Sequence, residues 1–408
     1  MKLALYGGEP VRKTPLPERT PYGEEEKREL MEAIDSQELF YLPPNKVDKF
    51  EKAFAEKYGV KHAICSTSGT SAIHTAVAAL DANPGDEIVT SPVTDFGTIA
   101  GIIYQGLIPV FADWKPDTFN TDPEDIERKI TDRTRAILPV HLFGNPNDMD
   151  AIMDIAKRHN LPVIEDCCQA YCTYYKGKLV GTIGDIGCFS MQQSKHLTTG
   201  DGGVTITNSD KYADIMMLYH DKGWANRHAE GQRMYTRLGL NYRMNELTAA
   251  VALAQLPKVE NTVNIMRKLG DMLTGMISDI PGILPAPVTP GGKHSYWIYP
   301  TKITGYDPKL FVKALNAEGL DVGCGYTGKP IYSCSAALAE KKTFGNSSFP
   351  FDSHYTDRKI DYSEGLCPVA EAELPMTAIF RIYESWTEED IQDVAAAFRK
   401  VAEGLANQ

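Results

Sequence analysis

Apolar runs alternate with amphipathic segments from about residue 22 to residue 255. Residues 24–36 and 47–58 place apolar side chains at helical spacing. Short apolar runs of strand length then recur at 62–65, 87–90, 108–111, 136–140, 162–164 and 187–190. Helix-length segments such as 71–80 and 148–159 lie between most of them. This order predicts an α/β fold with a mostly parallel sheet that is buried on both faces.

The pattern changes in the remainder of the chain. A helix at 247–255 and a longer one reaching about residue 277 precede a segment rich in Pro and Gly at 278–292. A strand is predicted at 296–299, a helix at 308–318 and a last helix at 387–405. We therefore expect a large domain over 1–255, with an N-terminal arm at 1–21. A connecting helix and a smaller α+β domain would occupy 256–408.

Composition excludes several classes of protein. The chain has 408 residues, of which 43% are hydrophobic and 24% charged, as in an ordinary soluble globular protein. Its net charge of -12 argues against general nucleic-acid binding. No signal-peptide core and no membrane-spanning run is apparent. The eight cysteines lack zinc-type pairs, so we expect no metal, and a reducing cytoplasm is the expected setting.

Polar side chains follow the predicted strands. Ser66 to Thr70 come after one strand and open a helix, Asp166 ends another, and Ser190 ends a third. Ligands of parallel sheets bind outside the carboxyl ends of the strands. A helix start with free N–H groups binds anions, although Ser68 could equally serve as a simple helix cap.

Lys195 is the most informative residue of the chain. It follows Ser190 by five residues and precedes a Gly-rich turn at 200–203, and Asp166 lies twenty-nine residues upstream. Pyridoxal phosphate requires a lysine amine for its aldehyde and a carboxylate for its pyridinium nitrogen. The combination predicts such a site. Asp166 could instead cap a helix, and Glu165 should point away from it along an extended strand.

Several motifs in order resemble the DegT/DnrJ/EryC1/StrS family of sugar aminotransferases. They are the opening Gly7–Arg12, Ser68–Thr70, Gly85–Ile88, Pro139–Gly144, Glu165–Ala170, the Lys195 segment and Asn241–Met244. The resemblance covers nearly the whole chain. It implies a fold-type-I enzyme with a mostly parallel, seven-stranded type of sheet and a smaller C-terminal α+β domain. It also implies pyridoxal phosphate as cofactor and a homodimer.

The resemblance also implies roles for individual residues. Lys195 would be the Schiff-base lysine and proton shuttle, and Asp166 would pair with the pyridine nitrogen. Gln169 would face the phenolic oxygen of the cofactor, and Phe96 would stack on its ring, although Phe96 alone could simply pack under a loop. The phosphate would be held by the remaining cofactor-binding residues, Gly69, Thr70, Ser190 and, from the other subunit, Asn241.

The implied reaction moves an amino group from glutamate or glutamine to a keto sugar, nucleotide-linked or free, or to a keto cyclitol. Such reactions belong to amino-sugar and secondary-metabolite biosynthesis. Asp95 and the pair Cys167–Cys168 depart from the family pattern. Two alternatives remain: a dehydratase or aromatising synthase of the same family, and a non-catalytic regulatory relative. The retained Lys195, Asp166 and Ser190 argue against the second.

The sequence leaves the substrate pocket poorly determined. Six polar or aromatic residues in predicted loops are candidates, and Trp224 and Arg227 could bind a ring and an anion. The six are Tyr41, Trp224, Arg227, His228, Tyr235 and Tyr326.

Overall fold

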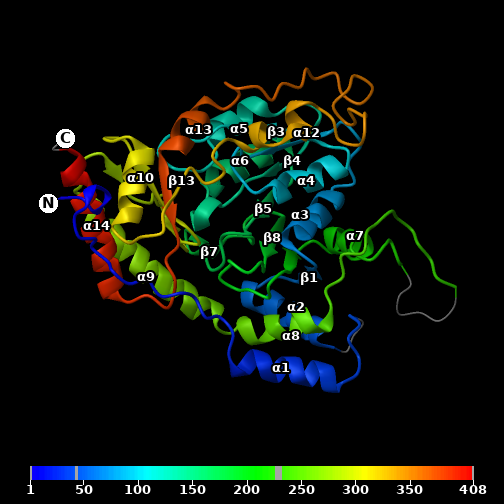
Figure 1. The fold of residues 1–408 in the computed structure, drawn as a ribbon. Helices are drawn as coiled ribbons and strands as arrows, with labels where there is room; N and C mark the ends of the chain where they lie inside the picture. The colour runs from blue at the N-terminus through cyan, green and yellow to red at the C-terminus, as the bar shows by residue number, and fades with distance from the viewer. Residues whose placement is uncertain (1, 42–44, 226–231, 407–408) are drawn as a thin grey trace.

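The computed structural model describes residues 2–41, 45–225 and 232–406. It contains two hydrophobic cores, a large one around a mixed sheet and a smaller one near the two chain termini (Figure 1). The long helix α9 (Val259–Ile277) runs between them and contributes Val259 and Val263 to the large core and Leu269 to Ile277 to the smaller one. Among the described residues, no helix combines the length and apolar character needed to cross a bilayer.

The large core surrounds seven strands in the order β1-β9-β8-β5-β4-β2-β3. A four-stranded and a three-stranded sheet are joined by bridges from Ile137 to Val163 and from Val140 to Asp166. Within the order only β9 runs antiparallel to its neighbours. The strands are β1 (His62–Ser66), β2 (Glu87–Thr90), β3 (Ile108–Phe111), β4 (Thr134–Leu138), β5 (Ile164–Asp166), β8 (Ile186–Ser190) and β9 (Gly203–Thr207). The predicted fold class is confirmed.

Helices cover this sheet because each has one apolar stripe. In α6, the buried residues Met149, Ile152, Ile155 and Ala156 recur at helical spacing, and the Asp148 side chain accepts a hydrogen bond from Ala151 at the start. Helix α3 packs on β8 and β9, with α4 and α7 beside it. The helices of this region are α1 (Glu24–Asp35), α2 (Lys46–Tyr58), α3 (Gly69–Ala78), α4 (Phe96–Tyr104), α5 (Pro123–Lys129), α6 (Met149–His159), α7 (Asp210–Tyr219) and α8 (Glu246–Gln255).

The smaller core lies between an antiparallel sheet, in the order β10-β12-β14-β13, and helices α9, α10 and α14. The strand predicted at 296–299 was misplaced, since β12 begins only at Tyr299. Tyr296 has a φ of 51°, a left-handed conformation that no strand accommodates. The elements are β10 (Ile283–Leu284), β12 (Tyr299–Ile303), α10 (Pro308–Ala317), β13 (Gly323–Cys324), β14 (Thr377–Phe380) and α14 (Glu388–Ala406).

Two segments pack against the core that is distant from them in sequence. The N-terminal arm lies on the smaller core, where buried Glu318 accepts hydrogen bonds from the backbone N–H groups of Ala4 and Val11. Residues 331–374 return to the large core, into which they place Ile331 and Tyr362. A domain limit at 255/256 stays a prediction, because the chain passes between the cores more than once.

Several further elements are only a few residues long. Three short strands form a separate small sheet, and the others are short helices of three to six residues. They are η1 (Ala4–Tyr6), η2 (Leu142–Gly144), β6 (Tyr174–Tyr175), β7 (Lys178–Leu179), β11 (Gly292–Lys293), α11 (Ile331–Cys334), α12 (Ala336–Ala339), α13 (Pro368–Glu373) and η3 (Leu374–Met376).

Candidate active site

The carboxyl ends of β1, β5 and β8 meet at one edge of the sheet, and the start of α3 lies against them. A Cβ atom added to Gly69, the first residue of α3, would lie 2.6 Å from Cβ of Ser190 and 3.1 Å from Sγ of Cys168. Thr70 lies beside the start of α4, since a Cβ added to Gly97 would lie 2.4 Å from Thr70 Oγ1. The close approach of Ser190 and Cys168 to the backbone at Gly69 explains why glycine is required at position 69.

The start of α3 is suited to an anion. Ser68 caps the helix by accepting a hydrogen bond from the Ser71 N–H group, so the cap that the sequence allowed is present. The cap satisfies only one of the free N–H groups of the first turn. Gly69, Thr70 and Ser190 therefore form a corner of the kind that binds a phosphate at a helix N-terminus.

Asp166 lies at the end of β5 and is 3% exposed. Its Oδ2 accepts a hydrogen bond from Thr98 Oγ1 at 2.8 Å, and its Oδ1 accepts one from the Cys168 N–H group at 3.0 Å. The hydrogen bond from Cys168 closes a turn, and no helix begins here, so Asp166 does not serve as the helix cap that the sequence allowed. Among the described residues, no cationic side chain lies within ion-pair distance of Asp166. A buried carboxylate without a cation is costly, so Asp166 is suited to a protonated ring nitrogen.

Lys195 is held from both sides by residues far away in sequence. The guanidinium of Arg19, in the N-terminal arm, donates hydrogen bonds to the carbonyl oxygens of Lys195 and His196. The Lys195 Nζ lies 3.6 Å from the centre of the Trp297 ring. Burial lowers the pKa of Lys195 to about 8, while the nearby Cys168 and Asp166 oppose this shift. The amine is thus far easier to deprotonate than an ordinary lysine.

His196 does not take the place of the lysine. Its Nε2 donates a hydrogen bond to the Ser295 carbonyl oxygen at 3.0 Å, and burial lowers its pKa to about 3. The ring is therefore neutral at physiological pH and is engaged with the backbone rather than with the pocket.

Three further residues, Gln169, Phe96 and Asn241, were predicted to contact the cofactor. Gln169 is buried beside Asp166, where its Oε1 accepts a hydrogen bond from the Phe143 N–H group and its Nε2 lies 3.3 Å from the Tyr326 hydroxyl. Phe96 is 39% exposed at the first position of α4. Asn241 is exposed and pairs with Asp221 through a backbone bridge, and no hydrogen bond among the described residues links it to the corner of Gly69, Thr70 and Ser190. The structure thus brings Gly69 beside Ser190 and Lys195 near Asp166, and Thr70 lies beside the start of α4. The roles of Phe96, Gln169 and Asn241 stay predictions.

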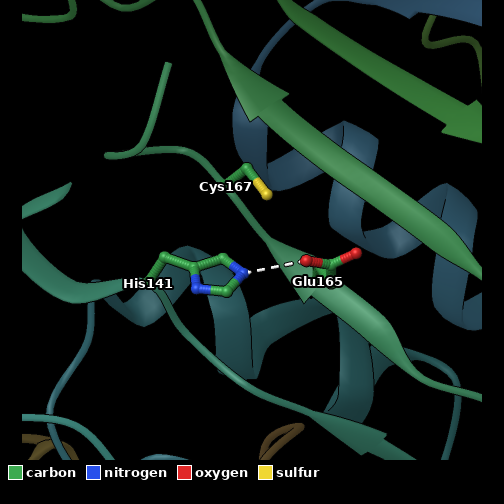
Figure 2. A group of neighbouring side chains, drawn as sticks. All are labelled: His141, Glu165 and Cys167. Atoms are coloured by element: carbon green, nitrogen blue, oxygen red, sulfur yellow. Dashed lines mark hydrogen bonds and ion pairs between the residues drawn. The ribbon is translucent and has the colours of Figure 1, made fainter. Parts of the chain in front are cut away.

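Glu165 belongs to a second polar cluster, with His141 and Cys167 (Figure 2). Its carboxylate accepts hydrogen bonds from His141 Nε2 at 3.0 Å and from the N–H groups of Gly181, Ile183 and Gly184. His141 Nδ1 accepts a further hydrogen bond from the Asn147 N–H group at 3.1 Å. Burial raises the pKa of the Cys167 thiol well above its usual value. The three groups have the spacing of metal ligands. Both ring nitrogens of His141 and the Glu165 carboxylate are already engaged in hydrogen bonds, which disfavours a cation.

A cavity of about 1020 Å³ opens between the N-terminal arm and the smaller core. Ser194, Tyr326 and Arg381 line it, so it reaches the segment that carries Lys195. Sequence reasoning missed Arg19, Trp297 and Arg381. Only Arg381 had a local signal, as a single charge within the apolar run from Ala378 to Ile382.

The substrate-pocket candidates from the sequence are only partly supported. Tyr326 lines this cavity. The Tyr41 hydroxyl donates a hydrogen bond to buried Asp221, which indicates a structural role. Trp224 pairs with Tyr235 through a backbone bridge. Arg227 and His228 lie outside the described residues.

Comparison with known proteins agrees with this geometry. Residues 21–399 match the model of the DegT/DnrJ/EryC1/StrS aminotransferase family. A putative L-glutamine:3-amino-2,3-dideoxy-scyllo-inosose aminotransferase of Micromonospora echinospora is 39% identical over 70% of this chain and 68% of its own length. The spore coat polysaccharide biosynthesis protein SpsC of Bacillus subtilis is 33% identical over 94% and 95%.

Solved structures agree as well. An aminotransferase from Psychrobacter cryohalolentis is 28% identical and superposes with a TM-score of 0.81, over 97% of this chain and 100% of its own. The predicted family, enzyme class and cofactor are confirmed. The corner at Gly69, the unpaired Asp166 and the buried Lys195 are what that cofactor requires. The chain belongs to the DegT/DnrJ/EryC1/StrS aminotransferase family and is a pyridoxal-phosphate-dependent aminotransferase.

Proposed function

We propose that this enzyme moves an amino group from glutamine or glutamate to a ketone on a sugar, nucleotide-linked or free, or on a cyclitol. The observation that carries the proposal is the Lys195 amine, which is buried, has a pKa lowered to about 8 and lies in the field of Asp166. The names of two relatives support the substrate classes, since one is a putative glutamine-dependent cyclitol aminotransferase and the other serves polysaccharide biosynthesis.

In this proposal each residue has a separate task. Bound pyridoxal phosphate supplies an electrophilic aldehyde and an electron sink. Gly69, Thr70 and Ser190 hold the phosphate. Asp166 keeps the ring nitrogen protonated, with Thr98 and the Cys168 N–H group fixing its orientation.

The remaining tasks concern the proton and the ring. Lys195 anchors the cofactor and then carries a proton to and from the reacting carbon through Nζ. Its lowered pKa places both protonation states within reach near neutral pH. Phe96 and Gln169 contact the ring and its phenolic oxygen.

A homodimer with shared sites completes the proposal. Between α7 and α8, the described residues 232–245 extend beyond the body of the molecule in Figure 1, and they include Asn241. Leu238 is 95% exposed there, and Met234, Tyr235 and Leu240 are also exposed. Such an apolar surface on a projecting segment is typical of an interface. Asn241 would then reach the phosphate of the other subunit. A cytoplasmic setting stays a prediction.

The donor half of the reaction tests the proposal without knowledge of the acceptor. Glutamine or glutamate should convert the bound cofactor to its amine form, with an absorbance shift to shorter wavelength. A panel of nucleotide-linked keto sugars, free keto sugars and keto cyclitols should then contain a member that reverses the shift. If neither donor produced the shift while a sugar lost water, the dehydratase alternative would replace this proposal.

A further inference from the structure

Arg381 follows strand β14 and faces the cavity with most of its hydrogen-bonding groups unused. Its one hydrogen bond among the described residues runs from Nη1 to the Ser194 carbonyl oxygen, at 3.4 Å. A guanidinium has five N–H donors, and this long contact engages only one. The side chain is half-buried and lines the cavity beside Tyr326.

The other cations that line this cavity have acidic partners. Arg12 pairs with Asp390 at 2.8 Å, Arg19 with Glu384 at 2.8 Å, and Lys13 with Glu9 at 3.6 Å. For Arg381, no carboxylate lies within ion-pair distance in the described part of the chain. Burial lowers its pKa, and the nearby groups that favour its charge are the hydroxyls of Tyr383 and Tyr326.

A half-buried guanidinium without a counter-charge costs free energy in the folded protein. That cost is offset when an anion binds, and a planar fork of N–H groups matches a carboxylate best. Arg381 is therefore placed as an anion-binding group.

The position of Arg381 relative to Lys195 restricts which anion can bind to the Arg381 guanidinium. The Lys195 Nζ and the Arg381 Cζ lie 3.6 Å and 4.7 Å from the centre of the same Trp297 ring. Ser194 fixes this arrangement, because its carbonyl oxygen accepts hydrogen bonds from both Trp297 Nε1 and Arg381 Nη1. Arg381 also lies near enough to lower the pKa of Lys195 through its charge, so one small molecule can span both groups.

An amino acid meets this condition, because its carboxylate is bonded to the carbon that bears the amine. In a nucleotide-linked sugar, a ring separates the diphosphate from most positions of the ketone. We propose that Arg381 binds the α-carboxylate of the amino donor. This inference rests on the proposed function for the identity of the donor, but the anion site itself does not depend on it.

Equilibrium binding tests the anion site without turnover. Glutarate, which lacks an amine and cannot react, would be titrated into the cofactor-loaded enzyme by calorimetry. Arg381→Met should weaken its binding by roughly thirtyfold or more, and Arg381→Lys by less. Arg399→Met is the matched control, because Arg399 is an exposed arginine paired with Asp279 on the outer face of the smaller core. Unchanged binding in Arg381→Met, or no binding by the wild type, would overturn the site.

The donor half-reaction tests the identity of the ligand. With glutamine, Arg381→Met should raise the half-saturating concentration by roughly tenfold or more while changing the limiting rate less. With the α-amide of glutamine, wild type and Arg381→Met should react alike, since the carboxylate is absent. A defect confined to the acceptor half-reaction of a nucleotide-linked sugar would overturn the donor assignment.

The two experiments separate the two proposals. Glutarate binding that depends on Arg381, without any conversion of the cofactor by a donor, would refute the proposed function and leave the anion site standing. Normal conversion by glutamine in Arg381→Met would refute this inference and leave the proposed function standing.

Discussion

Two polar clusters lie back to back at the end of β5, and they differ in how completely their groups are satisfied. On one side, the Glu165 carboxylate accepts a hydrogen bond from His141, and both side chains are fully buried (Figure 2). It also accepts hydrogen bonds from three backbone N–H groups. On the other side, Asp166 accepts two hydrogen bonds, and no cation lies within ion-pair distance of it in the described chain. Lys195 and Arg381 share one indole ring and have no acidic partner within ion-pair distance there.

The difference separates a structural cluster from a binding one. The Glu165 cluster ties the end of β5 to the loop at 181–184, and adding a ligand would require breaking existing bonds. In the cluster of Asp166, Lys195 and Arg381, no charged group has an oppositely charged partner within ion-pair distance in the described chain. A protein tolerates such groups where a bound ligand supplies the opposite charge. Glu165 and Asp166, which are adjacent in β5, thus have different roles because their side chains face opposite sides of the sheet.

The largest expected effect is at Lys195. Lys195→Ala should remove the covalent attachment of the cofactor and lower activity by on the order of 10⁴-fold, because the anchor and the proton carrier are lost together. Borohydride reduction followed by peptide mass spectrometry would measure the attachment. A reducible adduct at another lysine in the variant would contradict the assignment.

A matched pair of substitutions tests the comparison of the two acids directly. Asp166→Asn should lower the rate by roughly 10²- to 10³-fold with little change in stability, because the ring nitrogen loses its charged partner. Glu165→Gln should lower the free energy of unfolding by about 2 kcal/mol, since an amide cannot accept from every donor around it. Turnover per folded molecule and denaturant unfolding would be measured for both. A loss of stability in Asp166→Asn together with a loss of rate in Glu165→Gln would contradict the assignment of one cluster to binding and the other to structure.

Subunit mixing tests whether the binding cluster is completed by a second chain. Lys195→Ala and Asn241→Ala should each be inactive as pure dimers. After exchange at equal amounts, about a quarter of wild-type activity should return, because half of the dimers are mixed and each has one intact site. Exchange would be verified by a tag on one variant. No recovery after verified exchange would argue against a shared site.

The smallest effect concerns pH. In the enzyme without cofactor, the Lys195 amine reacts only when neutral, so its acylation rate should rise with pH and level off above about 8. An exposed lysine with the usual pKa of about 10.4 should keep gaining rate to higher pH. Mass spectrometry of peptides after brief acylation at several pH values would compare them. Arg381→Met should shift the Lys195 profile upward, since Arg381 lowers this pKa. A profile like that of exposed lysines would contradict the burial argument.

Much of the fold followed from local pattern alone. Strand β2 matches its predicted range, and α3 and β8 lie within one or two residues of theirs, because buried strands and amphipathic helices have fixed periods. Strand β9 and helix α4 were not predicted. The run Gly203–Thr207 alternates apolar residues with Thr, and the start of α4 at Phe96 is nearly all apolar, so neither has a clear period.

The order of residues along the chain was sufficient to identify Lys195 and Asp166, because their chemistry depends on residue type and on position at strand ends. Trp297, Arg19 and Arg381 could not be found in this way. Each reaches the Lys195 segment across more than a hundred residues, in contacts between Arg19 and Lys195, between Trp297 and Ser194 and between Arg381 and Ser194. Such contacts exist only once the arm and the smaller core pack against the sheet, and burial among them is what lowers the pKa of Lys195.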